Sequence, residues 1–155
     1  MQIAIPAPNR LQLISNLDQH LVNLTDLLLQ SKQAHWNLKG MLFIPLHDLF
    51  DELAQQLRNH TDEVAERLVQ LGGATDGSAQ HIATQTQLGT LPQGFVSGTD
   101  LTRLLGERTA FCTNLIRQDI EIAIELGDQD TADLYIQISR DLDKFLWKLR
   151  SHTEG

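Results

Sequence analysis

Two pairs of metal-binding side chains lie between residues 45 and 71, each at a spacing that brings two ligands to one ion. His47 and Asp51 are four residues apart, and so are Asp62 and Glu66. On a helix, residues at this spacing share one face, so each pair can converge on a single ion. Imidazole nitrogen together with carboxylate oxygen is a ligand set suited to iron, zinc or manganese.

The two pairs are too far apart to bind one ion within a single chain. A rise of about 1.5 Å per residue puts Asp51 and Asp62 roughly 16 Å apart along a helix. At about 100° per residue, the four side chains fall in an arc of roughly 100°, centred about 140° from the apolar stripe of the same helix. They are therefore expected to point out of their own bundle. A two-fold axis that crosses the helix near Gln56–Leu57 would pair it with the same helix of a second subunit. The His47/Asp51 end of each helix would then lie beside the Asp62/Glu66 end of its partner, and the symmetry would produce this meeting twice.

This spacing permits a metal site shared between two subunits, but it does not require one. For each carboxylate alone, the ordinary alternative is a solvated polar face. His35 is a further candidate ligand because it continues an apolar stripe seven residues after Leu28 and needs a polar partner. The alternative for His35 is a core histidine bonded to a backbone carbonyl. For Trp36, beside it, plain packing is the simpler interpretation.

Four amphipathic helices are expected to position these residues. Apolar residues at three- and four-residue steps predict helices over about residues 9–39, 45–71, 100–126 and 130–149. Asn9 and Asp130 are the predicted N-caps of the first and the fourth helix. Gly40, Gly72–Gly73 and Gly127 are suited to the helix ends that precede them.

Residues 74–99 are rich in Gly, Thr, Gln and Ser and poor in large apolar side chains. We expect a long crossover there, with a short helix near Ser78–Thr86, because structureless loops of this length are uncommon in compact domains. One long connection between two short ones fits an all-α, ferritin-like four-helix bundle. We assign residues 1–155 to one domain, with residues 1–9 as a short N-terminal tail.

Composition excludes several classes of protein. Twelve Lys and Arg against twenty Asp and Glu give a formal net charge of −8, which disfavours a general affinity for nucleic acid. No apolar run reaches the roughly 18–20 residues that a membrane helix needs, and the N-terminal residues lack a signal-peptide pattern. Cys112 is the only cysteine, so an intrachain disulfide and a cysteine zinc site are excluded. A cytoplasmic protein is expected.

Several motifs together resemble the Dps family of miniferritins. They are Lys32-Gln-Ala-His35-Trp-Asn-Leu-Lys-Gly40, Phe43-Ile-Pro-Leu-His47-Asp-Leu-Phe-Asp51, Asp62-Glu-Val-Ala-Glu66-Arg, Leu71-Gly-Gly73, Thr131-Ala-Asp and Ser139-Arg-Asp-Leu-Asp-Lys-Phe-Leu-Trp147. The resemblance spans about residues 10–150. It implies a hollow homododecamer with di-iron ferroxidase centres at two-fold interfaces. One subunit would supply His35, His47 and Asp51 to each centre, and the other would supply Asp62 and Glu66.

The resemblance also implies an activity. Such proteins oxidise Fe(II), preferably with hydrogen peroxide and otherwise with dioxygen, and store the ferric mineral, which protects DNA from oxidative damage. Two iron ions occupy each centre, and zinc can substitute. Trp36 becomes a candidate radical sink. An ordinary ferritin carries Glu-x-x-His inside its bundle, and the absence of this motif from the sequence argues for a miniferritin.

Two further expectations follow from the resemblance. The resemblance implies an iron-entry pore at a three-fold axis, which four acidic residues are expected to line: Glu125, Asp128, Asp130 and Asp133. The alternative for these residues is helix capping and a solvated turn. The rival function is a DNA-binding, nucleoid-compacting structural protein. Relatives that bind DNA commonly use a lysine-rich tail, whereas residues 1–10 contain no Lys, so direct DNA binding is not expected. His20, His60, His81 and His152 are candidates only for extra metal sites.

Overall fold

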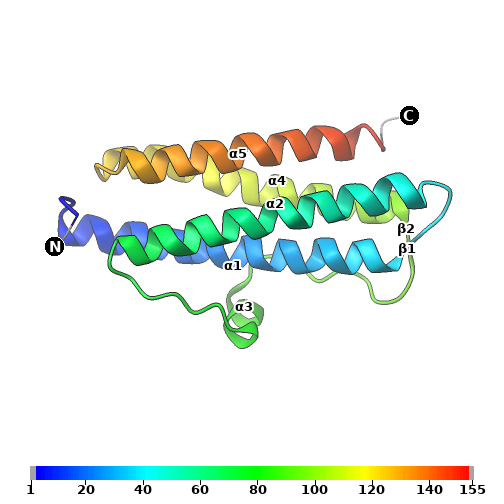
Figure 1. Cartoon of the computed structure of the whole chain (residues 1–155), viewed down its shortest axis with the longest axis horizontal. Helices are drawn as coiled ribbons and strands as arrows, with labels where there is room; N and C mark the ends of the chain where they lie inside the picture. The colour runs from blue at the N-terminus through cyan, green and yellow to red at the C-terminus, as the bar shows by residue number, and fades with distance from the viewer. Residues whose placement is uncertain (1–2, 154–155) are drawn as a thin grey trace.

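The computed structural model describes residues 3–153 and is built from four long helices, with a crossover that carries a short fifth helix (Figure 1). The helices are α1 (Ala7–Asn37), α2 (Phe43–Gln70), α3 (Ala79–Gln85), α4 (Gly98–Glu125) and α5 (Gln129–Arg150). Two-residue strands β1 (Leu38–Lys39) and β2 (Val96–Ser97) pair in parallel at one end of the bundle. The all-α, ferritin-like architecture predicted from the sequence is therefore confirmed.

The apolar stripes of the four long helices meet in one core. Leu17 and Leu24 of α1 are fully buried, as are Leu53 and Leu57 of α2. Cys112 of α4 is buried with them, and this burial raises the pKa of its thiol to about 12. A buried thiol of this kind is a small apolar side chain rather than a nucleophile.

The crossover runs along α1 and is tied to it by side-chain hydrogen bonds. Ser78 caps α3 by accepting from the backbone N–H of His81, as the short helix predicted near Ser78–Thr86 requires. The Asn23 amide donates to the Gln87 side chain at 2.9 Å, and the Gln30 amide donates to the Gly89 carbonyl at 3.0 Å. Residues 74–99 therefore return the chain to the far end of the bundle in one ordered path.

The structure corrects both predicted N-caps. Helix α1 begins at Ala7, so Asn9 lies in its first turn, where its amide donates to the Leu126 carbonyl at 3.0 Å. Helix α5 is capped by Asp128 and not by Asp130, because the Asp128 carboxylate accepts from the Thr131 N–H at 3.0 Å. Asp130 is exposed in the first turn, where its charge still suits the helix dipole.

Asp128 also joins α2 to the turn between α4 and α5. Its carboxylate accepts from the Arg67 guanidinium at 2.7 Å, and Arg67 Nε donates to the Thr131 hydroxyl at 2.9 Å. Burial alone would raise the pKa of the Asp128 carboxyl, but hydrogen bonds from Thr131 and Arg67 lower it below its usual range. Asp128 is therefore an ionised cap that clamps three helices together.

Replacing Asp128 by Ala is expected to lower the free energy of unfolding by about 2–4 kcal/mol, because the cap is lost and the Arg67 guanidinium loses its partner. Asp130→Ala is the matched control, with a loss under about 1 kcal/mol. The contribution of Asp128 should be complete above its ordinary pKa of about 3.9 and be lost as the pH falls through the lowered folded value. Urea unfolding at fixed protein concentration measures both effects, and equal losses for the two variants would contradict the clamp.

Within residues 3–153, no helix is both long and apolar enough to cross a bilayer.

Candidate metal centre

His35 and His47 meet face to face where α1 ends and α2 begins. Their ring centroids are 3.6 Å apart, and the ring planes differ by 20°. His35 Nδ1 lies 2.8 Å from the His47 backbone oxygen, and His47 Nδ1 lies 2.9 Å from the His35 backbone oxygen. Because a carbonyl oxygen can only accept, each Nδ1 carries the donated proton. In the neutral form of each ring, the lone pair then lies on Nε2, the nitrogen that is suited to bind a metal ion.

Packing fixes these two rings further. Phe43, the first residue of α2, stacks on His47 with centroids 5.0 Å apart. His35 thus combines the two interpretations left open by the sequence: it is bonded to a backbone carbonyl, and that bond leaves its other nitrogen available for a ligand. Both histidines are half-buried.

Asp51 lies one turn after His47 on α2 and is already engaged. Lys32 Nζ donates to its Oδ1 at 2.6 Å, and the Gln55 amide donates to its Oδ2 at 3.0 Å. The hydrogen bond from Lys32 lowers the pKa of the Asp51 carboxyl, burial opposes this, and Gln55 lowers it further. The carboxylate is therefore ionised and oriented.

Asp62 and Glu66 lie away from these three residues. Both are exposed on α2, as the helical-wheel argument predicts. Among the residues that the structure describes, no group of three or more His, Cys, Asp or Glu side chains converges as a metal site would require. A single chain thus pairs His35 with His47 and holds Asp51 one turn further along, but it leaves the other two predicted ligands apart.

A hollow surface runs between the two sets of residues. A groove of about 700 Å³ between α1 and α2 is lined by Leu29, Lys32, Trp36, Asp51 and Arg58, among others. A second groove, of about 510 Å³, continues from Arg58 to Asp62. The side chain of Trp36 is 65% exposed in the first groove, so it is not packed inside the helical bundle of its own chain.

Comparisons with known proteins agree on one family. The family model for the ferritin-like domain matches residues 14–155. Over 150 residues the chain is 43% identical to the DNA protection during starvation protein of Agrobacterium fabrum, with 97% of this chain and 93% of that protein covered. The chain belongs to the Dps family. This membership assigns it to the miniferritins, the ferritin-like proteins associated with iron storage and oxidative stress.

Solved Dps structures match the fold along almost the whole chain. DpsA14 from Streptomyces coelicolor is 31% identical with a TM-score of 0.93, and 98% of this chain and 90% of that chain are covered. Dps from Mycobacterium smegmatis is 27% identical with a TM-score of 0.95, with 100% and 94% covered. The family resemblance stated from the sequence motifs is confirmed.

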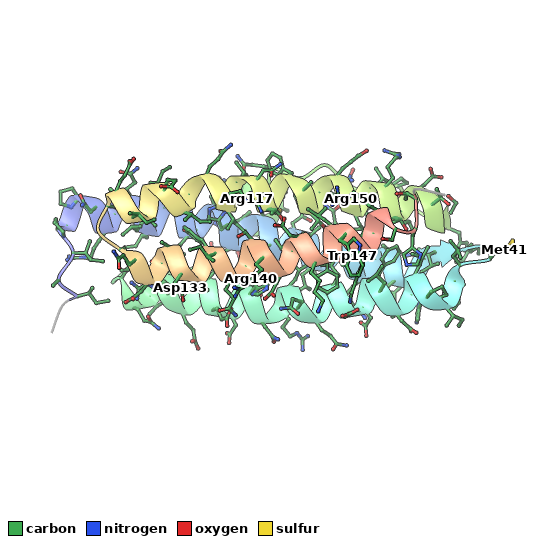
Figure 2. The ribbon with its side chains drawn as sticks, turned by 90° about the horizontal axis from the view of Figure 1, so that it is seen from above. Met41, Arg117, Asp133, Arg140, Trp147 and Arg150 are labelled. Carbon is green, nitrogen blue, oxygen red and sulfur yellow. The ribbon has the colours of Figure 1, made fainter. Side chains whose placement is uncertain are left out.

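The acidic turn of this Dps chain contains three exposed carboxylates and one buried one. Glu125, Asp130 and Asp133 are exposed around the junction of α4 and α5, and Figure 2 places Asp133 at this end of the bundle, opposite Met41. Asp128 is 3% exposed and paired with Arg67, so its carboxylate is not available to a pore. The pore remains a prediction, and we carry the three exposed carboxylates forward as its candidate residues.

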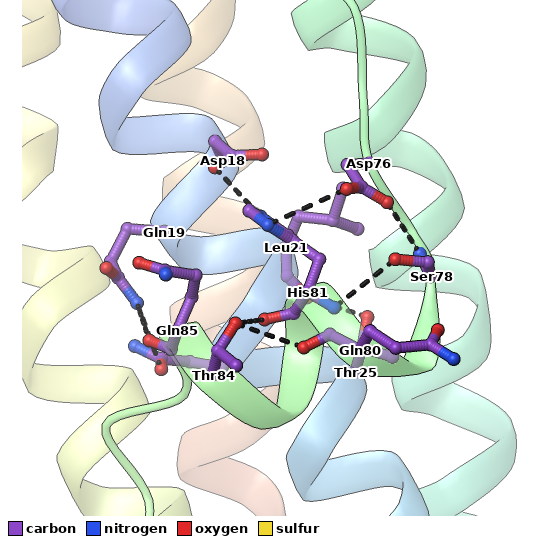
Figure 3. Close-up of polar contacts among 11 residues, drawn as sticks. Asp18, Gln19, Leu21, Thr25, Asp76, Ser78, Gln80, His81, Thr84 and Gln85 are labelled. Atoms are coloured by element: carbon purple, nitrogen blue, oxygen red, sulfur yellow. Dashed lines mark hydrogen bonds and ion pairs between the residues drawn. The ribbon is translucent and has the colours of Figure 1, made fainter.

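Three of the remaining histidines, His20, His60 and His81, lie close to carboxylates, most of them on other elements. His20 Nε2 lies 2.7 Å from Asp119, and His60 lies between Glu63 at 3.3 Å and Asp141 at 3.4 Å. The His–Asp partners come from elements distant in the sequence, which is why spacing arguments missed them. Figure 3 shows a third case on the crossover.

That third case does not form a metal site either. His81 Nε2 lies 3.5 Å from Asp18, and its Nδ1 lies 3.8 Å from Asp76. Because the two carboxylates face different ring nitrogens, they do not converge on one point. His152 is half-buried near the end of α5 and borders a separate shallow groove with Trp147. His20, His60 and His81 therefore add contacts between elements, and none of the four histidines belongs to a ligand cluster among the described residues.

Proposed function

We propose that this chain is a ferroxidase that oxidises Fe(II) at centres shared between two subunits and stores the ferric product inside a homododecameric shell. The observation that carries the proposal is the pair of stacked imidazoles whose Nδ1 atoms are held by backbone carbonyls, beside the ionised Asp51. Each centre would take His35, His47 and Asp51 from one copy. Asp62 and Glu66 would come from a second copy laid along the α1–α2 groove.

The donor set matches the chemistry of the substrate iron. Carboxylates bind both Fe(II) and Fe(III), and neutral imidazoles add affinity without adding charge. Two Fe(II) ions bound side by side supply two electrons to hydrogen peroxide, which takes up two protons and leaves as two water molecules. The O–O bond is then broken without release of a hydroxyl radical. Peroxide is therefore the proposed oxidant, with dioxygen as the slower alternative.

The proposal also covers zinc binding at the centre and a role for Trp36 beside it. The same imidazole and carboxylate donors suit zinc, which has no redox chemistry and would occupy the centre without turnover. Trp36 follows His35 directly and lines the groove beside Asp51. The proposed radical-sink role is that its indole ring takes up an oxidising equivalent that escapes the centre.

An anaerobic Fe(II) titration tests the proposal. The assembled protein is expected to bind two Fe(II) per centre, and subsequent peroxide is expected to oxidise them at one peroxide per two iron ions, read optically. His35→Ala combined with His47→Ala should abolish this fast phase. His152→Ala is the matched control, because that residue lies outside the proposed centre, and it should behave as wild type. Equal oxidation by the double variant would contradict the proposed centre.

The acidic turn is proposed to attract iron on its way in. Three copies of Glu125, Asp130 and Asp133 around a three-fold axis would raise the local concentration of cations. Changing these residues to Gln, Asn and Asn should slow iron uptake several-fold and weaken its dependence on ionic strength, with assembly intact. Stopped-flow uptake at several salt concentrations measures this. Unchanged kinetics would place the entry route elsewhere.

A further inference from the structure

His81 lies between two carboxylates where α3 packs against α1 (Figure 3). Its Nε2 is 3.5 Å from Asp18 Oδ2 of α1, and its Nδ1 is 3.8 Å from Asp76 Oδ2 of the crossover. The Nε2 atom is shielded from solvent and has no hydrogen-bond partner among the described residues. A shielded ring nitrogen costs free energy unless it gains a hydrogen bond. The cluster therefore lacks one favourable contact that its geometry almost provides.

One more proton on the imidazole ring would satisfy both contacts. A neutral imidazole has a single N–H, so it can donate to Asp18 or to Asp76 but not to both. An imidazolium has an N–H on each ring nitrogen, and each of these nitrogens faces one carboxylate. Histidine is the side chain whose charge ordinarily changes between about pH 5 and pH 8. The contacts of His81 therefore favour a firmer attachment of α3 at the acid end of this range.

We propose that His81 is a proton-operated clasp, which fastens α3 to α1 in a mildly acidic medium and releases it at alkaline pH. None of its three residues belongs to the proposed ferroxidase centre, so this inference goes beyond the proposed function. Hydrogen bonds from Ser78 lower the pKa of the Asp76 carboxyl, slight burial opposes them, and His81 lowers it further. Asp76 is therefore an anion in both states, and the proton on His81 is what changes.

Few other contacts hold α3 against the bundle. Among the seven described residues of α3, Ile82 alone is buried. The Gln19 amide of α1 donates to the Gln85 carbonyl at 3.3 Å in an exposed position. A segment with so few buried apolar contacts opens locally at a small cost in free energy. The two contacts of His81 are therefore a large part of what fastens this helix.

The crossover contains little else that could respond to pH. Its residues 74–99 include only two ionisable side chains, Asp76 and His81. Two charged groups of the bundle also contact the crossover, and both do so after the end of α3. The Asp26 carboxylate accepts from the Thr86 hydroxyl, and the Arg108 guanidinium donates to backbone carbonyls further along the chain. A pH response confined to α3 would therefore identify His81.

The clasp lies beside the groove that reaches Asp62. Asp18, Leu21 and Thr25 follow one another at three- and four-residue steps, so they share a face of α1. Leu21 and Thr25 line the groove of about 510 Å³ that leads to Asp62, and Figure 3 draws both of them next to α3. A fastened α3 therefore gives this groove a fixed edge, and a released α3 gives it a mobile one.

Hydrogen–deuterium exchange of the assembled protein, read by mass spectrometry, tests the clasp. Between about pH 8 and about pH 5.5, the protection factors of the amides at 79–86 should rise about fivefold in wild type, as two charge-assisted hydrogen bonds at a partly exposed position would give. These factors are corrected for the intrinsic pH dependence of exchange. His81→Gln should show no such rise, because its amide does not titrate. Peptides of α5 are the internal reference and should change little.

The matched control for the loss of a histidine is His152→Gln, near the end of α5, which should keep the full rise in α3. His20 is a second titratable group near the crossover, since it is bonded to Asp119 in the groove beside Gln85. A rise that persists in His81→Gln would therefore point to His20 and overturn the clasp.

Asp18→Asn keeps the imidazole and removes one of its two partners, so about half of the rise should be lost. This variant also decides the matter if His81→Gln does not assemble, because a full rise in Asp18→Asn would contradict the proposed contacts. Protection of α3 that does not change with pH in wild type would overturn the clasp. Equal rises in α3 and α5 would do the same, since they would report a change in the whole bundle.

Discussion

Two inactive variants, His47→Ala and Glu66→Ala, are expected to regain ferroxidase activity when they assemble together. In a mixed dimer, one centre would combine the intact histidines of one copy with the intact Glu66 of the other, and the second centre would lack both. With equal and random mixing, about a quarter of the wild-type centres should be restored. The measurement is the initial rate of Fe(II) oxidation by peroxide after co-refolding, with two affinity tags proving that both chains are present.

The matched control is a mixture of His35→Ala with His47→Ala. These two ligands belong to the same half of a centre, so every centre of a mixed dimer would carry one defect and no activity should return. Recovery in this control, or none in the first mixture despite proven co-assembly, would show that the centre is not divided between subunits in the proposed way.

Plasmid DNA mixed with Fe(II) and hydrogen peroxide is expected to stay intact when the wild-type protein is present. The proposed reaction consumes both reactants that generate hydroxyl radicals. The triple variant His35→Ala, His47→Ala, Asp51→Ala should lose this protection and leave most of the plasmid nicked, as gel electrophoresis would show. DNase I should cut the plasmid freely in the presence of either protein, because a chain with a formal charge of −8 is repelled by phosphates.

The crossed comparison decides between the two functions. If the triple variant still protects against peroxide and the wild type also blocks DNase I, the protein acts by covering DNA, and the nucleoid-compacting alternative is correct. A gel-shift titration at low salt and without magnesium supplies an independent reading. A tight complex there would support the alternative, and free plasmid would support the chemical mechanism.

Much of the fold could be predicted from the sequence, because apolar steps along a helix encode which face is buried. The four long helices and the short α3 lie within a few residues of their expected ranges. The N-cap of α5 was predicted wrongly since Asp128 and Asp130 offer the same carboxylate two residues apart. The choice is made by Arg67, which lies 61 residues away in the sequence and meets Asp128 only after α2 and α5 have packed.

The candidate site likewise combines features that depend on a single helix with contacts that depend on how two helices pack. The four-residue steps from His47 to Asp51 and from Asp62 to Glu66 depend on one helix alone, so spacing was sufficient to find them. The stacking of His35 on His47 depends on how the end of α1 meets the start of α2. The contact of Lys32 with Asp51 depends on the same junction. No pattern within one helix encodes these contacts. The sequence therefore could not show which atoms of His35, His47 and Asp51 are already hydrogen-bonded.

The reciprocal hydrogen bonds between His35 and His47 have a consequence for when iron chemistry can start. Because these bonds form within one chain, half of the proposed centre is already ordered in each newly folded subunit. This half is close to electrically neutral, since Lys32 offsets the charge of Asp51. The anionic attraction for iron resides in Asp62 and Glu66, at the other end of α2. A lone subunit therefore holds the rigid half of the site without the half that draws cations toward it. Under this arrangement, insoluble ferric iron is produced only after subunits have joined, when there is an enclosed space to receive it.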